Sequence, residues 1–152
     1  MPRTDPAPVE ISPFAADERA RWEVLARGYK TFYETTLPAE DYERTWQRLR
    51  TGETILGLGA RIEGRLVGIA HYFFHPHVWT ADVCYLQDLF VDEACRGRGA
   101  ARALIMAVAE RARAQGAPRL YWQTKESNTR ARALYDTVAR FNGFIRYDIV
   151  LN

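Results

Sequence analysis

The sequence predicts an α/β domain in which helices pack on a mixed, mostly antiparallel β-sheet. Three apolar or alternating segments follow one another between residues 53 and 93, and the first two meet at Glu63-Gly64, a hairpin signal. Segments with helical periodicity lie before and after them. Strands joined by hairpins run antiparallel, whereas a strand–helix–strand crossover runs parallel, so we expect a mixed sheet.

The segments before the hairpin predict one short strand and two amphipathic helices. Residues 1–8 are rich in proline and are expected to form a flexible tail, and residues 9–14 (VEISPF) predict a short strand. Apolar residues recur at helical spacing over residues 16–34. Residues 37–52 predict a second helix, with Pro38 in its first turn and Gly52 at its end.

The segments after residue 93 predict a crossover helix, a strand, a helix and a last strand. Apolar residues at positions 101, 104, 105, 108 and 112 predict a helix that ends at Gly116. Residues 119–124 predict a strand, and residues 127–141 a helix with Ser127 as its N-cap. Residues 144–152 (FIRYDIVLN) predict the last strand.

Composition favours an ordinary globular protein. The chain has 152 residues, 47% of them hydrophobic and 26% charged, which suits one domain with a real core. The formal net charge is only +2, without a basic block, so we expect no nucleic-acid partner. The two cysteines, Cys84 and Cys95, are too few for a disulfide framework, and we expect them to be reduced. We find no signal peptide or membrane-length apolar run and therefore expect a cytoplasmic protein without a membrane partner.

A glycine- and arginine-rich stretch, residues 96–99 (RGRG), stands where a strand gives way to a helix. The first N–H groups of a helix lack internal partners and lie at the positive end of its dipole, so such an end can bind phosphate. From composition alone, a glycine turn with two solvated arginines is an equal alternative. The stretch lacks the Gly-Lys-Ser/Thr ending of a P-loop, and Arg102 stands where a dinucleotide fingerprint needs a third glycine.

Residues 96–101 (RGRGAA) match Arg/Gln-x-x-Gly-x-Gly/Ala, the pyrophosphate loop of the Gcn5-related N-acetyltransferases, the GNAT family. The segments 85–105 and 119–147 resemble that family's strand, loop and helices, and GYKTFYETTL and Trp79 are similar to a branch with fungal histone and polyamine acetyltransferases. The resemblance implies one acyl-CoA N-acyltransferase domain over residues 9–152. It also implies about six to seven strands, about four helices and strands that splay apart at the cofactor cleft.

The same resemblance implies how acetyl-CoA would bind. Backbone amides of the loop would wrap the pyrophosphate, and the open edge of the preceding strand would bond the amides of the pantetheine arm. An asparagine after the next strand would touch that arm. The implied residues are Leu89, Phe90, Val91, Arg96, Gly97, Arg98, Gly99, Ala100, Ala101 and Asn128.

The resemblance assigns the proton donor for the departing CoA thiolate to Tyr135. An unperturbed phenol titrates near 10, so it stays protonated at neutral pH and can act as an acid. From spacing alone, Tyr135 also fits the apolar stripe of its helix, which would make it a core residue.

The proton acceptor is less directly indicated. In the resembling branch a glutamate commonly stands where this chain has Gln87, which cannot accept a proton. The adjacent Asp88 is our predicted base, although side chains alternate along a strand and a bulge would be needed to bring Gln87 and Asp88 to one side. Asp82, Glu126 and Tyr85 are the alternatives.

The family's acceptor site is commonly built from the first two helices and the loop between the third and fourth strands. In this region Glu34, Trp79, Asp82 and Gln87 are candidate acceptor residues, because carboxylates beside aromatic rings suit a cationic amine. Glu40 and Asp41 fit the positive end of a helix instead. The three histidines, His71, His75 and His77, come without a cluster of further ligands. We therefore predict a turn histidine pair in the stretch HPH, residues 75–77, and no metal site.

We thus predict an acetyl-CoA-dependent N-acetyltransferase in which a primary amine attacks the thioester directly in a ternary complex. The acceptor would be a polyamine-like small molecule or a protein lysine or N-terminus. The alternatives are an acyl-CoA-binding module without activity, which Gln87 would explain, an aminoglycoside-type acetyltransferase, and a nucleotide-binding protein. A homodimer is expected from the resemblance, with the C-terminal strand as a possible interface.

Overall fold

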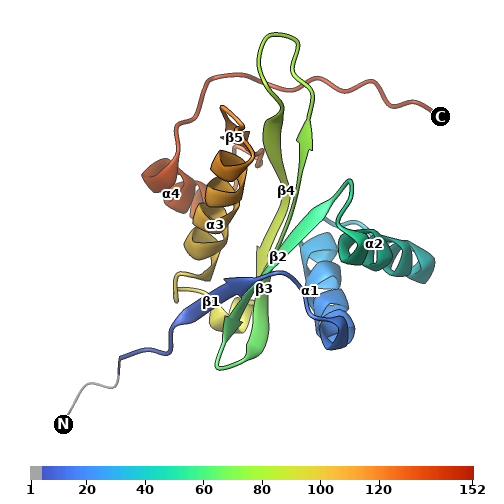
Figure 1. The fold of residues 1–152 in the computed structure, drawn as a ribbon, viewed down its shortest axis with the longest axis vertical. Helices are drawn as coiled ribbons and strands as arrows, with labels where there is room; N and C mark the ends of the chain where they lie inside the picture. Colours follow the sequence, from blue (N-terminus) through green and yellow to red (C-terminus); the bar gives the residue numbers. More distant parts are fainter. Residues whose placement is uncertain (1–4) are drawn as a thin grey trace.

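The computed structural model describes residues 5–152 and shows a five-stranded sheet in the order β1-β2-β3-β4-β5 (Figure 1). Its strands are β1 (Val9–Ser12), β2 (Leu56–Ile62), β3 (Arg65–His75), β4 (Val83–Val91) and β5 (Leu120–Tyr121). The first four strands pair antiparallel, and β5 pairs parallel to β4. The predicted mixed, mostly antiparallel fold class is confirmed. Residues 1–4 of the predicted tail lie outside the described residues.

Four helices cover the two faces of the sheet (Figure 1). The helices α1 (Arg19–Phe32) and α2 (Ala39–Thr51) lie on one face, and α3 (Ala100–Ala114) and α4 (Thr129–Val138) on the other. Pro38 is the N-cap of α2 rather than a residue of its first turn, while Gly52 ends the helix at a left-handed φ of 67°, as predicted. Two short 3₁₀ turns, η1 (Ala16–Glu18) and η2 (Glu93–Cys95), precede α1 and α3.

Each face of the sheet has its own hydrophobic core. The core under α1 and α2 is aromatic and contains the buried side chains of Phe14, Trp22 and Trp46. The core under α3 is aliphatic, and Leu104 and Val108 are fully buried there. Burying such side chains contributes roughly 1.5–3 kcal/mol each, so both helical layers are held to the sheet by apolar contacts.

The predicted hairpin between β2 and β3 is confirmed. Glu63 and Gly64 join the strands with φ values of 52° and 78°. Positive φ at both central residues is the type I′ geometry, whose twist matches that of the flanking strands.

The end of the chain departs from the prediction. Residues 139–152 form no regular secondary structure, so the last strand predicted over residues 144–152 is wrong and the sheet has five strands instead of six to seven. An alternating pattern supplies the propensity for a strand but not a neighbouring strand with which to pair. The same region shows two smaller differences: β5 contains only two residues, and the N-cap of α4 is Asn128, not Ser127.

No helix within residues 5–152 is both long enough and apolar enough to cross a bilayer.

Candidate active site

The glycine- and arginine-rich loop leaves the start of α3 open. Gly97 and Gly99 have φ values of 81° and 84°, which residues with a Cβ rarely adopt. Gly99 is the N-cap of α3, and no side chain caps the helix or places an acid in its first turn. The N–H groups of this turn are therefore free to meet an anion, and Arg96 and Arg98 add charge beside them.

The strand that leads into this loop has a free edge. The strand β5 pairs with β4 only at Cys84 and Tyr85, whereas β3 pairs with β4 from Val83 to Val91, apart from Gln87. The strand β5 ends at Tyr121, so it does not pair with β4 beyond Tyr85, and the splay that the resemblance implied stays a prediction. The backbone groups of residues 87–91 on this side are consequently available to a ligand that carries amides.

A β-bulge in β4 changes the direction of its side chains. The register of β3 and β4 pairs Tyr72 with Leu86 and His71 with Asp88, so Gln87 is the extra residue. The bulge that Asp88 needed in order to share a side with Gln87 is therefore present, and both residues line the same cavity.

The packing of the β4 side chains against the two cores shows this change of direction. Before the bulge, Cys84 and Leu86 belong to the core under α3. After it, Leu89 and Val91 pack against that core and Phe90 packs against the core under α1 and α2. Without the bulge, strict alternation would turn the residues at even positions after it, Asp88 included, toward α3.

Asp88 is the end of a chain of hydrogen bonds that begins at the fully buried Trp22. The indole Nε1–H of Trp22 donates to Nε2 of His71 over 2.9 Å, and Nδ1 of His71 lies 2.8 Å from Oδ2 of Asp88. An indole N–H can only donate, so Nε2 must accept and the ring proton must be on Nδ1. His71 is therefore a neutral imidazole that donates to the Asp88 carboxylate.

This arrangement favours the ionised form of Asp88. Burial raises the pKa of Asp88, but the hydrogen bond from His71 and the charge of Lys30 outweigh it and hold the pKa below its usual value of 3.8. Tyr29 reaches over the bulge, and its hydroxyl donates to the backbone oxygen of Gln87 over 3.4 Å. Burial and the charge of Asp88 raise the pKa of Tyr29, so its phenol stays protonated beside the carboxylate.

The cavity beside Asp88 has a volume of about 170 Å³ and lies between the sheet and the helices α1 and α2. Side chains from α1, α2, β3 and β4 form its polar lining. The residues with charged or titratable side chains are Tyr29, Lys30, Asp41, Tyr42, Arg48, His71, Tyr72 and Asp88. A small polar molecule in this cavity would therefore meet both signs of charge.

Tyr135, the predicted acid, belongs to α4 on the opposite face of the sheet, but it lies close enough to Tyr33, the residue that ends α1, for the two phenols to interact. Its ring packs edge-on against Trp122 at 5.4 Å and against the core under α3, as its place on the helical stripe predicted. Burial raises the pKa of Tyr135 to about 12. The phenol is thus protonated at every ordinary pH, which a proton donor requires, and its catalytic role stays a prediction.

Asn128 has a structural task that the sequence pattern did not indicate. Its side chain accepts from the backbone N–H of Ala131 and donates to Thr124, so it caps α4. Contact with the cofactor arm stays a prediction for this residue.

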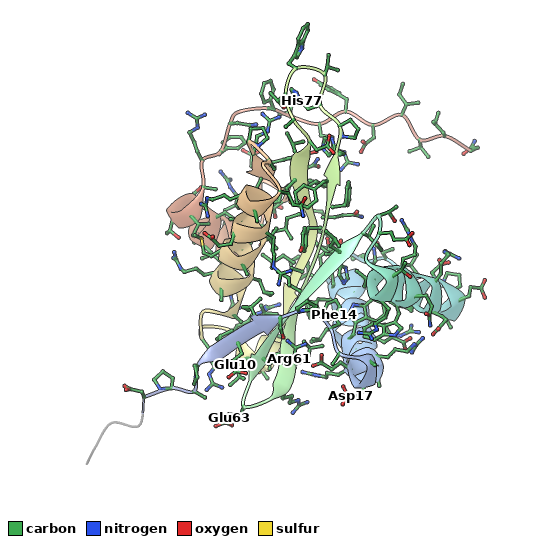
Figure 2. All side chains as sticks on the ribbon, viewed as in Figure 1. Glu10, Phe14, Asp17, Arg61, Glu63 and His77 are labelled. Carbon is green, nitrogen blue, oxygen red and sulfur yellow. The ribbon has the colours of Figure 1, made fainter. Side chains whose placement is uncertain are left out.

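The other predicted site residues lie outside the cavity. Trp79 is 87% exposed and Asp82 is exposed in the β3–β4 loop, and Figure 2 shows His77 in the same loop, beyond the ends of the strands. Glu34 is exposed just after α1. Of the four candidate acceptor residues, the structure brings only Gln87 to Asp88. Of the other bases considered, Tyr85 packs on Tyr121, while Glu126 is exposed.

The sequence analysis missed His71, Trp22, Lys30 and Arg48 as site residues and assigned Asp41 to the helix dipole alone. His71 lies in the middle of β3 and pairs with Asp88 of β4. No local signal could have found this pair, because it depends on the register of β3 and β4.

Within residues 5–152 no group of three or more His, Cys, Asp or Glu side chains is arranged to hold a metal ion.

Comparison with known proteins agrees with this geometry. The family model described as "Acetyltransferase (GNAT) family" matches residues 21–141. The D-amino-acid N-acetyltransferase of Saccharomyces cerevisiae is 38% identical over 128 residues, which cover 81% of this chain and 78% of that protein. The thialysine N-epsilon-acetyltransferase of Caenorhabditis elegans is 32% identical over 90 residues, 59% of this chain and 56% of that protein.

Solved structures share the fold at lower identity. The aminoglycoside acetyltransferase AAC(6')-Iy, in complex with a bisubstrate analogue, has a TM-score of 0.84 at 17% identity and covers 96% of this chain and 100% of its own. The ribosomal-protein-alanine N-acetyltransferase of Brucella melitensis has a TM-score of 0.79 at 23% identity, covering 95% and 99%. The family match and the yeast relative show that this chain is an enzyme of the GNAT acetyltransferase family, similar to its fungal branch.

Proposed function

We propose that this enzyme transfers the acetyl group of acetyl-CoA to the primary amine of a small molecule, with Asp88 accepting the proton that the amine gives up. The observation that carries this proposal is the ionised Asp88 in a small cavity beside the free edge of β4. A cavity of about 170 Å³ is smaller than the roughly 300–1,000 Å³ of typical ligand pockets, which favours a small amine over an aminoglycoside.

The chain offers fitting partners for each part of acetyl-CoA. The uncapped start of α3 at Gly99, Ala100 and Ala101, with Arg96 and Arg98, suits the pyrophosphate. The open edge at Leu89, Phe90 and Val91 suits the amides of the pantetheine arm. When bound, acetyl-CoA supplies the thioester whose acetyl group the amine takes.

Asp88 acts late in this scheme. An alkylammonium group with a pKa near 10.4 would give its proton to a carboxyl group of pKa 3.8 only at a cost of about 9 kcal/mol. The amine therefore reacts from its neutral fraction. As the new N–C bond forms, the nitrogen becomes acidic, and Asp88 then accepts the proton. His71 keeps the carboxylate ionised and oriented, and Tyr135 holds the proton that the departing thiolate needs.

Thiol release tests the proposal. Purified protein would be incubated with acetyl-CoA and a panel of small primary amines, with a thiol reagent as the readout and mass spectrometry to identify the acetylated product. We expect release that depends on the amine, and a Tyr135→Phe variant that is slower by about tenfold to a hundredfold. Thiol release no faster with any amine than without one would overturn the proposed function.

We also propose that the protein is a homodimer that covers its C-terminal segment, residues 139–152. This segment carries large apolar side chains that are almost fully exposed, with Phe144 at 82%, Tyr147 at 86% and Ile149 at 88%. Exposed apolar surface of this extent supports a protein interface. Light scattering on the full chain should give twice the monomer mass, and Tyr147→Ser with Ile149→Ser should shift it toward the monomer. A monomer in the unaltered chain would refute the dimer.

A cytoplasmic location is part of the proposal. Both cysteines are free, and burial raises the pKa of Cys84 to about 11, which keeps it a thiol. Unpaired cysteines suit a reducing compartment.

A further inference from the structure

The side chains of this protein carry very few primary amines. Of its 21 cationic residues, all but Lys30 and Lys125 are arginine. An arginine guanidinium stays protonated at every ordinary pH and is not a nucleophile, whereas a lysine amine is one as soon as it loses its proton. The positions of the two lysines therefore decide which side chain of the protein an acetyl donor could modify.

Lys30 stands in the cavity that contains the proposed proton acceptor. Its side chain, in the last turn of α1, is partly buried and lines the cavity together with Asp88. Its charge lowers the pKa of the Asp88 carboxyl group, so the two charged groups are near each other. The amine of Lys30 thus lies in the cavity where the proposed function places the amine of a small acceptor.

No other charged group of the described chain holds the ammonium of Lys30. Within residues 5–152 it forms neither an ion pair nor a side-chain hydrogen bond, and it lies 5.6 Å from the centre of the Tyr29 ring. A cation in the last turn of a helix favours the dipole, but this role does not require a lysine. The last turns of α2 and α3 carry arginines instead. The flexible stem of Lys30 is therefore free to change its rotamer within the cavity.

We propose that Lys30 is a modification site, and that the enzyme acetylates its own Lys30 when acetyl-CoA is bound and no small amine occupies the cavity. This proposal rests on the acetyl transfer of the proposed function. The neutral Nζ of Lys30 attacks the thioester carbonyl carbon, so that an N–C bond forms and the C–S bond breaks. Asp88 takes the proton that the nitrogen loses, and Tyr135 gives a proton to the CoA thiolate. The products are an amide at Nζ of Lys30 and free CoA.

Acetylation of Lys30 would inhibit the enzyme. The acetyl group would fill part of a cavity of only about 170 Å³, and a neutral amide would replace the ammonium group. The pKa of Asp88 should rise, because one of the charges that lower it is lost. The modified enzyme should therefore accept small amines poorly, and it would form when acetyl-CoA is abundant and the acceptor is scarce.

Mass spectrometry of the purified full chain tests the modification. The protein would be incubated with acetyl-CoA and no amine, and its peptides would be followed over time. We expect acetylation of Lys30 to be about tenfold or more faster than that of Lys125, at a rate that does not depend on protein concentration. The exposed Lys125 is the control within the same chain, because purely chemical acetylation would favour the more accessible amine.

Variants separate an enzymatic reaction from a chemical one. Asp88→Asn should slow the acetylation of Lys30 by about tenfold or more and leave that of Lys125 unchanged. A mixture of Asp88→Asn protein, which keeps Lys30, with Lys30→Arg protein, which keeps Asp88, should show no faster acetylation of Lys30 than Asp88→Asn protein alone. Faster acetylation in the mixture would overturn a reaction within one cavity.

The inhibition has its own measurement. Preincubation of the unaltered protein with acetyl-CoA should lower its later thiol release with a reactive amine in proportion to the fraction of chains acetylated at Lys30. The same amine, present during the preincubation, should prevent the loss. Lys30→Arg should lose no activity on preincubation, whatever its initial rate. Lys125→Arg is the matched control and should lose activity as the unaltered protein does.

The outcomes separate this proposal from the proposed function. Amine-dependent thiol release without acetylation of Lys30 overturns self-acetylation and leaves acetyl transfer to small amines standing. So does equal acetylation of Lys30 and Lys125 that Asp88→Asn does not change. Acetylation of Lys30 that depends on Asp88, with no thiol release that any amine stimulates, keeps self-acetylation and overturns the small-molecule acceptor. If neither reaction occurs, both proposals fail.

Discussion

The two faces of the sheet build their parts of the site in different ways. On the α3 face, Gly97 and Gly99 create an open helix start within a few consecutive residues. On the α1–α2 face, the hydrogen bonds of the proton-accepting group join residues 49 and 17 positions apart, from Trp22 to His71 and from His71 to Asp88. An anion site can thus be local in the chain, whereas orientation and charge of a catalytic carboxylate depend on tertiary packing.

Replacing Asp88 should have the largest effect on activity, because it removes the proposed proton acceptor on the α1–α2 face of the sheet. The change Asp88→Asn keeps the shape and can still accept from His71, but it cannot take a proton. We expect kcat/KM to fall by about a hundredfold or more, measured by thiol release. Asp41→Asn is the comparison within the same cavity: its carboxylate is paired with Arg44, so the loss should be clearly smaller. Equal losses would show that Asp88 has no special role.

Breaking the chain of hydrogen bonds behind Asp88 should have the next largest effect. His71→Leu removes the donor to the buried carboxylate, and we expect kcat to fall by about tenfold to a hundredfold. His71→Gln retains an N–H donor and should recover part of this loss. Trp22→Phe removes the N–H that fixes the ring proton of His71 on Nδ1. The proton should then also occupy Nε2, and ¹⁵N chemical shifts of the imidazole can follow this change. A ring proton on Nε2 of His71 in the unaltered protein would contradict the deduced chain.

Two glycines with the same backbone geometry test the anion site on the α3 face. Gly99 and Gly143 have φ values of 84° and 82°, and both have open space where a Cβ would stand. Alanine at either position carries a strain of roughly 1–2 kcal/mol where the backbone cannot relax. Only Gly99→Ala should weaken the binding of acetyl-CoA, by about fivefold to tenfold in calorimetry. If Gly143→Ala weakened the binding of acetyl-CoA equally, the loop at residues 96–99 would not be the pyrophosphate site.

The smallest expected effect is on stability in acid. The folded-state pKa of Asp88 is lowered, so its contribution to the free energy of unfolding is complete above the usual pKa of 3.8 and is lost as the pH falls through the lower folded-state value. Urea unfolding of the unaltered protein and of Asp88→Asn between pH 7 and 3 should therefore converge at the acid end. If the unaltered protein instead gained stability relative to Asp88→Asn as the pH fell from 7 to about 4, the folded-state pKa of Asp88 would be raised rather than lowered.

Much of the fold could be predicted because its signals are local. The hairpin at Glu63-Gly64, the end of α2 at Gly52 and the periodic stripe of α3 are each written into a few neighbouring residues. The strand predicted over residues 144–152 failed for the opposite reason. Alternation describes one strand only, and pairing needs a second strand whose position the segment itself does not contain.

The candidate site also has a part that local sequence determines and a part that depends on tertiary structure. By itself, the sequence determined the open helix start at residues 96–99 and the family to which it points, because glycine geometry and helix polarity act over short distances. Only the tertiary structure decided that Asp88 turns toward α1 and α2, since one extra residue in β4 reverses the direction of every side chain after it. It also decided that His71 belongs to the site, because its two partners come from a helix and a strand that meet it only in the folded chain.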